Sequence, residues 1–79
     1  MIIKILGTGC TKCKKLEDTV REVMQKNNIE GEIIKITQLD DIMKYGIMMT
    51  PGLVINEKVK SYGNIPKEEQ ILEWLKENQ

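Results

Sequence analysis

The stretch IIKILGTGCTKC, residues 2–13, decides the fold of this chain of 79 residues. It joins an apolar run of strand length, Ile2 to Leu6, through glycines to Cys10 and Cys13, the only two cysteines. Apolar residues then recur at helical spacing until Asn27 and Asn28, namely at Leu16, Val20, Val23 and Met24. The stretch therefore predicts a buried, central strand that turns directly into an amphipathic helix, with Cys10 at the helix N-terminus.

A cysteine in that position meets unpaired backbone N–H groups and the positive end of the helix dipole, and both favour a thiolate. Lys12, Lys14 and Lys15 place positive charge in the same turn. Their charge further lowers the thiol pKa, although the lysines could equally do no more than solvate one face of the helix. We therefore expect Cys10 to be a nucleophile near neutral pH.

Composition excludes some classes of protein. The 12 basic and 12 acidic residues give a formal charge of zero, which disfavours nucleic acid as a partner. The opening apolar run is too short for a signal peptide or a membrane span and contains Lys4, so we predict a cytoplasmic protein that does not bind membranes. In a reducing compartment, two cysteines in one Cys-x-x-Cys indicate catalysis or metal binding rather than a structural disulfide.

The first half of the chain predicts a β-α-β unit followed by a short helix. Ile33, Ile34 and Ile36 indicate a second strand, which a helical crossover would place parallel to the first. Thr37 and Asp40 resemble a capping box at the start of the short helix. That helix would carry Leu39, Ile42 and Met43 and end at Gly46.

The second half predicts a hairpin and a last helix. Leu53–Ile55 and Lys58–Tyr62 would pair antiparallel across a tight turn at Asn56-Glu57, with the second strand at the sheet edge. A final helix would run from Pro66, at its first position, to Glu77. The expected fold class is α/β, with the order βαβαββα and helices on both faces of a four-stranded mixed sheet.

This order, together with Cys10-x-x-Cys13 and the later Thr50-Pro51, resembles the thioredoxin superfamily, and more narrowly the small thioredoxin-like proteins called redox-active disulfide protein 2. The resemblance covers residues 1–79 as one thioredoxin-like domain. It implies that Pro51 is a cis-proline beside the dithiol and that the backbone of Thr50 pairs with substrates in a strand-like manner.

Three departures limit what the resemblance implies. Larger thioredoxins have a tryptophan before the first cysteine and Gly-Pro between the pair, where this chain has Gly9 and Thr11-Lys12. They also bury an acid six residues before the first cysteine, where this chain has Lys4, so another group or water must carry protons. The only tryptophan, Trp74, is far from the cysteines in sequence and is expected to contribute packing.

The resemblance implies a thiol-disulfide oxidoreductase in which Cys10 attacks a protein disulfide and Cys13 resolves the mixed disulfide. We expect the substrate to be an extended peptide bound at a small apolar rim around Cys10. The candidate substrate-binding residues are Gly9, Thr11, Lys12, Thr50, Pro51 and Gly63. The pair Met48-Met49 could be core filler or a soft apolar patch for such peptides.

No cofactor is expected, because the chain has no dinucleotide-binding Gly-x-Gly-x-x-Gly segment. Electrons would come from a separate thioredoxin-reductase-like donor, and the protein would act as a monomer. The main alternative is a carrier that binds Cu(I) or Zn through both thiolates. Such carriers follow βαββαβ and end on a strand, which disfavours this alternative. A third is an interaction module that uses the sheet edge at Lys58–Tyr62.

Overall fold

The computed structural model describes all 79 residues, and its elements follow the expected order βαβαββα. The strands are β1 (Ile2–Leu6), β2 (Glu32–Ile36), β3 (Gly52–Ile55) and β4 (Lys58–Tyr62). The helices are α1 (Thr11–Lys26), α2 (Leu39–Met43) and α3 (Glu68–Glu77).

The four strands form one mixed sheet in the order β2-β1-β3-β4. Strands β1 and β2 are parallel, whereas β3 runs antiparallel to both β1 and β4. The predicted β-α-β unit, the central place of β1 and the edge position of β4 are therefore confirmed.

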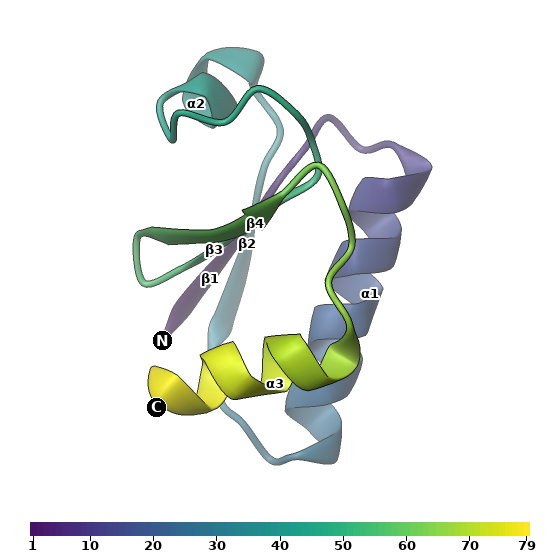
Figure 1. Ribbon diagram of the computed structural model, residues 1–79, viewed down its shortest axis with the longest axis vertical. Coiled ribbons are helices and arrows are strands. Elements are labelled where there is room, and N and C mark those ends of the chain that lie inside the picture. Colours follow the sequence, from purple (N-terminus) through teal and green to yellow (C-terminus); the bar gives the residue numbers. More distant parts are fainter.

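Helices cover both faces of this sheet (Figure 1). Because side chains alternate along a strand, Leu53 and Ile55 of β3 belong to the larger core cluster, which also contains Leu16 of α1 and Ile71 of α3. Val54 between them belongs to a smaller cluster with Leu6, Ile42 of α2 and Ile47. The sheet thus separates a core under α1 and α3 from a smaller core under α2.

Two predicted helix starts were wrong. The cap of α2 is Gln38, which makes no side-chain capping bond, so Thr37 lies one residue too early for a capping box. The cap of α3 is Lys67 in an extended conformation, and its carbonyl accepts the N–H groups of Gln70 and Ile71. Pro66 therefore precedes the cap instead of occupying the first helical position.

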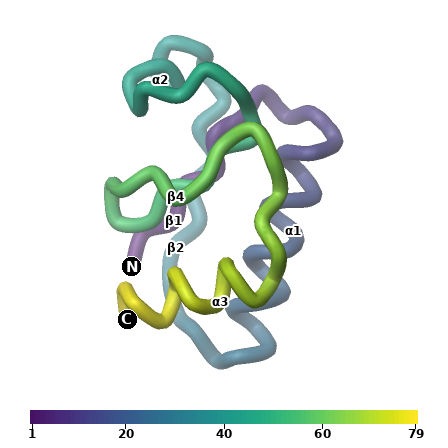
Figure 2. Tube along the Cα trace, in the orientation of Figure 1, coloured from purple at the N-terminus to yellow at the C-terminus, as the bar shows by residue number.

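The β3–β4 turn has the geometry that a two-residue hairpin requires. Asn56 and Glu57 have φ values of 49° and 68°, and positive φ at both central residues matches the twist of the paired strands. The Asn56 side chain accepts the N–H of Ile2 and contacts Asn78, so both chain ends lie near this turn (Figure 2).

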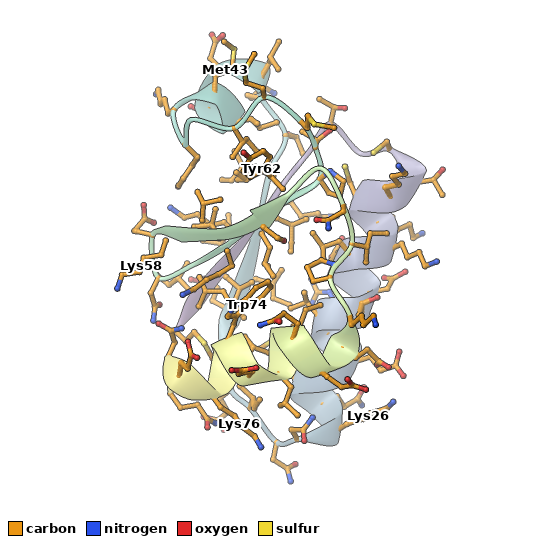
Figure 3. The ribbon with its side chains drawn as sticks, viewed as in Figure 1. Lys26, Met43, Lys58, Tyr62, Trp74 and Lys76 are labelled. Carbon is orange, nitrogen blue, oxygen red and sulfur yellow. The ribbon has the colours of Figure 1, made fainter.

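Trp74 of α3 packs against the larger core, as expected, and Figure 3 shows it between α3 and the sheet. None of the three helices combines the length and the apolar character needed to cross a membrane.

A substitution of Ile55 tests how much the larger core contributes to stability. Ile55 is fully buried, so Ile55→Ala should lower the free energy of unfolding by about 2–5 kcal/mol through lost burial and a cavity. Val59→Ala on the exposed edge strand is the control and should cost less than about 1 kcal/mol. Urea unfolding followed by circular dichroism measures both. Equal losses would contradict the assignment of Ile55 to the core.

Candidate active site

The two cysteines lie where β1 turns into α1. Strand β1 ends at Leu6, and Cys10 is the N-cap of α1 with an extended backbone (φ −71°, ψ 170°). The carbonyl of Cys10 accepts the N–H of Lys14 at 3.1 Å, which closes the first helical turn. The prediction that Cys10 lies at the helix N-terminus is confirmed.

The two sulfurs are close together but differ in exposure. Both are free thiols whose sulfur atoms are 2.9 Å apart, beyond the covalent distance of about 2.05 Å. Cys10 is exposed, whereas Cys13 is only 5% exposed. A molecule arriving from solvent therefore meets the sulfur of Cys10 first.

Their surroundings shift the two thiol pKa values in opposite directions. A hydrogen bond from the Cys13 thiol lowers the pKa of Cys10, and backbone N–H groups at the helix start add to this effect. Burial raises the pKa of Cys13, and its hydrogen bond to Cys10 raises it further. The lysine side chains of the first turn are not among the main causes, so the Cys10 thiolate is stabilised chiefly by Cys13 and the helix terminus.

Gly7 makes room for the buried sulfur. A Cβ atom built on Gly7 would lie 2.1 Å from the Cys13 sulfur and 3.0 Å from its Cβ. Any side chain at position 7 would therefore displace Cys13. Gly7 was not among the predicted site residues, although a glycine at the end of a buried strand is a known signal of close approach.

The Thr50–Pro51 loop lies against the same junction. Its peptide bond is cis, and Pro51 is buried. The Cβ of Thr50 lies 4.0 Å from the position that a Gly7 Cβ would take, so Thr50 is close to the dithiol. The carbonyl of Pro51 accepts the N–H of Gly63 at 2.9 Å. The structure thus brings Thr50, Pro51 and Gly63 together beside β1.

The other three predicted substrate-binding residues flank Cys10 in the chain and are exposed. Gly9 has a φ of 94°, which a glycine adopts without strain, and no atom outside its neighbours lies near its missing Cβ. Thr11 and Lys12 begin the exposed side of α1. Their side chains make no hydrogen bond or ion pair within the protein, which leaves them accessible to a bound molecule.

Lys4, at the position of the acid in larger thioredoxins, is directed away from the dithiol. Its ammonium donates to the Tyr45 hydroxyl at 2.7 Å and forms an ion pair with Glu57. The hydrogen bonds to Glu57 and Tyr45 raise the pKa of Lys4, so this side chain stays protonated. Lys4 is therefore a structural link between β1, the segment after α2 and the β3–β4 turn.

The charged residues Glu17 and Lys35 share a cavity with Cys13. A cavity of about 170 Å³ between α1 and β2 is lined by Cys13, Glu17 and Lys35, among others. The Glu17 carboxylate accepts Arg21 at 3.0 Å and faces Lys35 at 3.5 Å, and the bond from Arg21 lowers the pKa of Glu17. This carboxylate is therefore ionised and charge-paired at neutral pH.

The two thiols are the only donor pair of this site for a metal. No three histidine, cysteine, aspartate or glutamate side chains are grouped to hold an ion. Two thiolates are a suitable pair for a soft metal such as Cu(I), so the cysteines themselves are the residues to test for metal binding.

The part of the chain that matches known proteins includes both cysteines and Pro51. Residues 1–76 match the family described as Thioredoxin domain. A protein named Thioredoxin from Methanothermobacter thermautotrophicus is 37% identical over 75 residues, which cover 95% of this chain and 97% of that protein. Another Thioredoxin, from Methanocaldococcus jannaschii, is 34% identical over 76 residues, covering 96% of this chain and 87% of that protein.

The opposite pKa shifts predict unequal alkylation of the reduced protein. Cys10 should react with iodoacetamide at a lower pH than an unperturbed thiol, because its thiolate persists to lower pH. Cys13 should react far more slowly, since it is buried. Mass spectrometry of peptides after timed labelling across pH measures both.

The Cys13→Ala variant provides the matched control. Loss of the thiol that donates to Cys10 should raise the pKa of Cys10, so labelling at a fixed pH below that pKa should slow. Faster labelling of Cys13 than of Cys10 in the wild type would contradict this description of the site.

Gly7→Ala tests the space around the buried sulfur. The added methyl group overlaps the Cys13 side chain, so the variant should lose about 1–3 kcal/mol of stability and close its disulfide more slowly. Thr8→Ala, an exposed neighbouring position, should change neither. Urea unfolding and the rate of intramolecular disulfide formation are the measurements, and wild-type behaviour of Gly7→Ala would refute the close contact.

Proposed function

Because this chain belongs to the thioredoxin family and is a thiol-disulfide oxidoreductase, we propose that it reduces protein disulfides with Cys10 as nucleophile and Cys13 as resolving thiol. The observation that carries these roles is the asymmetry of the two sulfurs. Cys10 is exposed with a lowered pKa, and Cys13 is buried with a raised pKa. Only the thiolate attacks, so Cys10 reacts first.

The reaction has two sulfur exchanges. The Cys10 thiolate attacks one sulfur of the substrate disulfide and forms a mixed disulfide, and the other substrate sulfur leaves as a thiolate that takes a proton from water. Cys13, 2.9 Å away, then loses its proton and attacks the Cys10 sulfur. The second substrate sulfur leaves and is protonated, and the dithiol has given two electrons to the substrate.

A separate reductase then restores the pair. A donor of the thioredoxin-reductase type returns two electrons and two protons to the Cys10–Cys13 disulfide, and the protein itself uses no cofactor for this transfer. In this proposal residues 1–79 act as one monomeric domain in electron transport in the cytoplasm. The use of both cysteines in a single Cys-x-x-Cys supports such a reducing compartment.

The substrate would lie across the loops beside Cys10. Thr50 supplies backbone groups for strand-like pairing with an extended peptide, and Pro51 and Gly63 hold that loop through their hydrogen bond. On the other side, Gly9, Thr11 and Lys12 are exposed next to the nucleophile. Together they form a shallow surface suited to a polypeptide.

Separate replacement of the two cysteines tests the proposal. Cys13→Ser should accumulate mixed disulfides with partner proteins, because nothing displaces the product, whereas Cys10→Ser should trap almost none. The measurement is a non-reducing gel of cell extract passed over each immobilised variant, with release by a reductant. Reduction of insulin by the wild type with a supplied reductant should fall to background in Cys10→Ser.

A metal carrier would give a different result with the same two variants. Either substitution would remove one ligand of a shared site, so metal affinity would fall similarly in both and neither would trap partners. Equal trapping by the two variants, or no trapping together with tight stoichiometric metal in the wild type, would overturn the proposed function.

A further inference from the structure

The cavity of about 170 Å³ beside Cys13 connects the buried thiol to the surface of the protein. Its floor is buried and is made by Ile5, Gly7 and Cys13. Its rim is exposed or half-buried and is made by Gly9, Lys14, Glu17, Lys35 and Thr37. The volume and the polar groups of the rim suit the cavity to hold water.

The resolving step requires Cys13 to lose a proton. The Cys13 thiol is hydrogen-bonded to the Cys10 sulfur, with 2.9 Å between the two sulfur atoms. Once Cys10 is joined to a substrate, its sulfur is no longer a thiolate and does not take this proton. Burial raises the pKa of Cys13, so the protonated thiol is favoured at neutral pH. Another proton acceptor is therefore needed at this step.

Glu17 is the one ionised acceptor among the residues that line the cavity. Lys14 and Lys35 carry ammonium groups, which donate hydrogen bonds but accept none. Thr37 has a neutral hydroxyl, and the remaining lining residues apart from the cysteine have no ionisable side chain. The hydrogen bond from Arg21 lowers the pKa of Glu17, so its carboxylate is unprotonated at neutral pH and ready to accept a proton.

The position of Glu17 on α1 places its carboxylate near Cys13. Glu17 follows Cys13 by four residues, so both lie on one face of the helix with about 5–6 Å between their Cβ atoms. The Oε2 atom of Glu17 contacts Arg21 at 2.9 and 3.0 Å. The Oε1 atom instead faces Lys35 of β2 at 3.5 Å. One carboxylate oxygen is therefore held by Arg21, while the other is directed across the space between α1 and β2.

The other face of β1 offers no acceptor for this proton. Side chains alternate along a strand, so Lys4 lies on the opposite face of the sheet from Ile5, which lines the cavity. On that face, covered by α2 (Figure 1), the Glu57 carboxylate forms an ion pair with Lys4. The sheet separates this carboxylate from Cys13.

We propose that Glu17 relays the proton of Cys13 to solvent through water in this cavity during the resolving step. This inference rests on the proposed function, which gives Cys13 the resolving role. Cys13 gives its proton to a water molecule, which passes a proton to Glu17 Oε1, and the Cys13 thiolate attacks the Cys10 sulfur. The Cys10–Cys13 bond forms, and the bond from Cys10 to the substrate sulfur breaks. That sulfur leaves with the electron pair as a thiolate, and Glu17 releases its proton to solvent.

Stopped-flow mixing of the reduced protein with dithiobis(nitrobenzoate) separates the two exchanges. The first exchange joins an aromatic thiol to Cys10 and releases one coloured thiolate, and attack by Cys13 releases the other. Because the aromatic thiolate leaves without a proton, the second rate measures deprotonation and attack by Cys13. Glu17→Gln should lower the second rate relative to the first by about a hundredfold at neutral pH, the low end of what a positioned base contributes.

Two controls distinguish proton transfer from a structural effect. Imidazole, a small soluble base, should restore the second rate of Glu17→Gln in proportion to its concentration. Glu22→Gln removes another ion-paired carboxylate of α1, which contacts Lys26 at 2.9 Å and lies outside the cavity. This variant should keep both rates of the wild type. Circular dichroism verifies that both variants fold.

Failure of the relay and failure of the proposed function give different results. A second rate that does not fall in Glu17→Gln, or a fall that imidazole does not restore, would overturn the relay alone. The proposed function would be overturned if the wild type released only one thiolate, as Cys13→Ser is expected to do.

Discussion

The register of β1 with its two neighbours is the constraint on which the rest of the structure depends. Leu6, the last residue of β1, pairs with Ile36 of β2 on one side and with Gly52 of β3 on the other. Gly7 and Pro51, the next residues on the two antiparallel strands, are thereby brought to the same end of the sheet. A shift of one residue would turn every β1 side chain to the opposite face. It would also remove Gly7 from Cys13, so sheet pairing and site geometry are fixed together.

The difference between the two thiols follows from the same junction. Cys10 caps the helix and remains exposed, whereas Cys13, one turn further, faces the sheet against Gly7. Burial penalises charge on Cys13 and leaves its S–H as a donor, which in turn favours charge on Cys10. One helix start therefore lowers the pKa of the Cys10 thiol and raises that of Cys13, and no ionised side chain is needed to distinguish them.

Local pattern predicts most of the fold, whereas long-range contacts determine the details of the site. The strands, the positive-φ turn at Asn56-Glu57 and the place of Cys10 follow from periodicity and spacing. The partners of Lys4 do not, because Tyr45 and Glu57 are 41 and 53 residues away in the chain and meet it only once the sheet has formed. The contact of Gly7 with Cys13 likewise depends on how α1 lies on the sheet. The two misplaced helix caps show that polar residues near a helix start do not by themselves fix its first residue.

The segment between α2 and β3 combines free backbone groups with fixed ends. Ile47 is anchored in the smaller core, where its Cδ1 approaches the missing Cβ of Gly52 within 2.7 Å, so a side chain at position 52 would push the segment outward. At the other end Met49 packs within 3.3 Å of the position that a Gly63 Cβ would take. Because both ends are held, residues 47–50 keep their shape without internal hydrogen bonds.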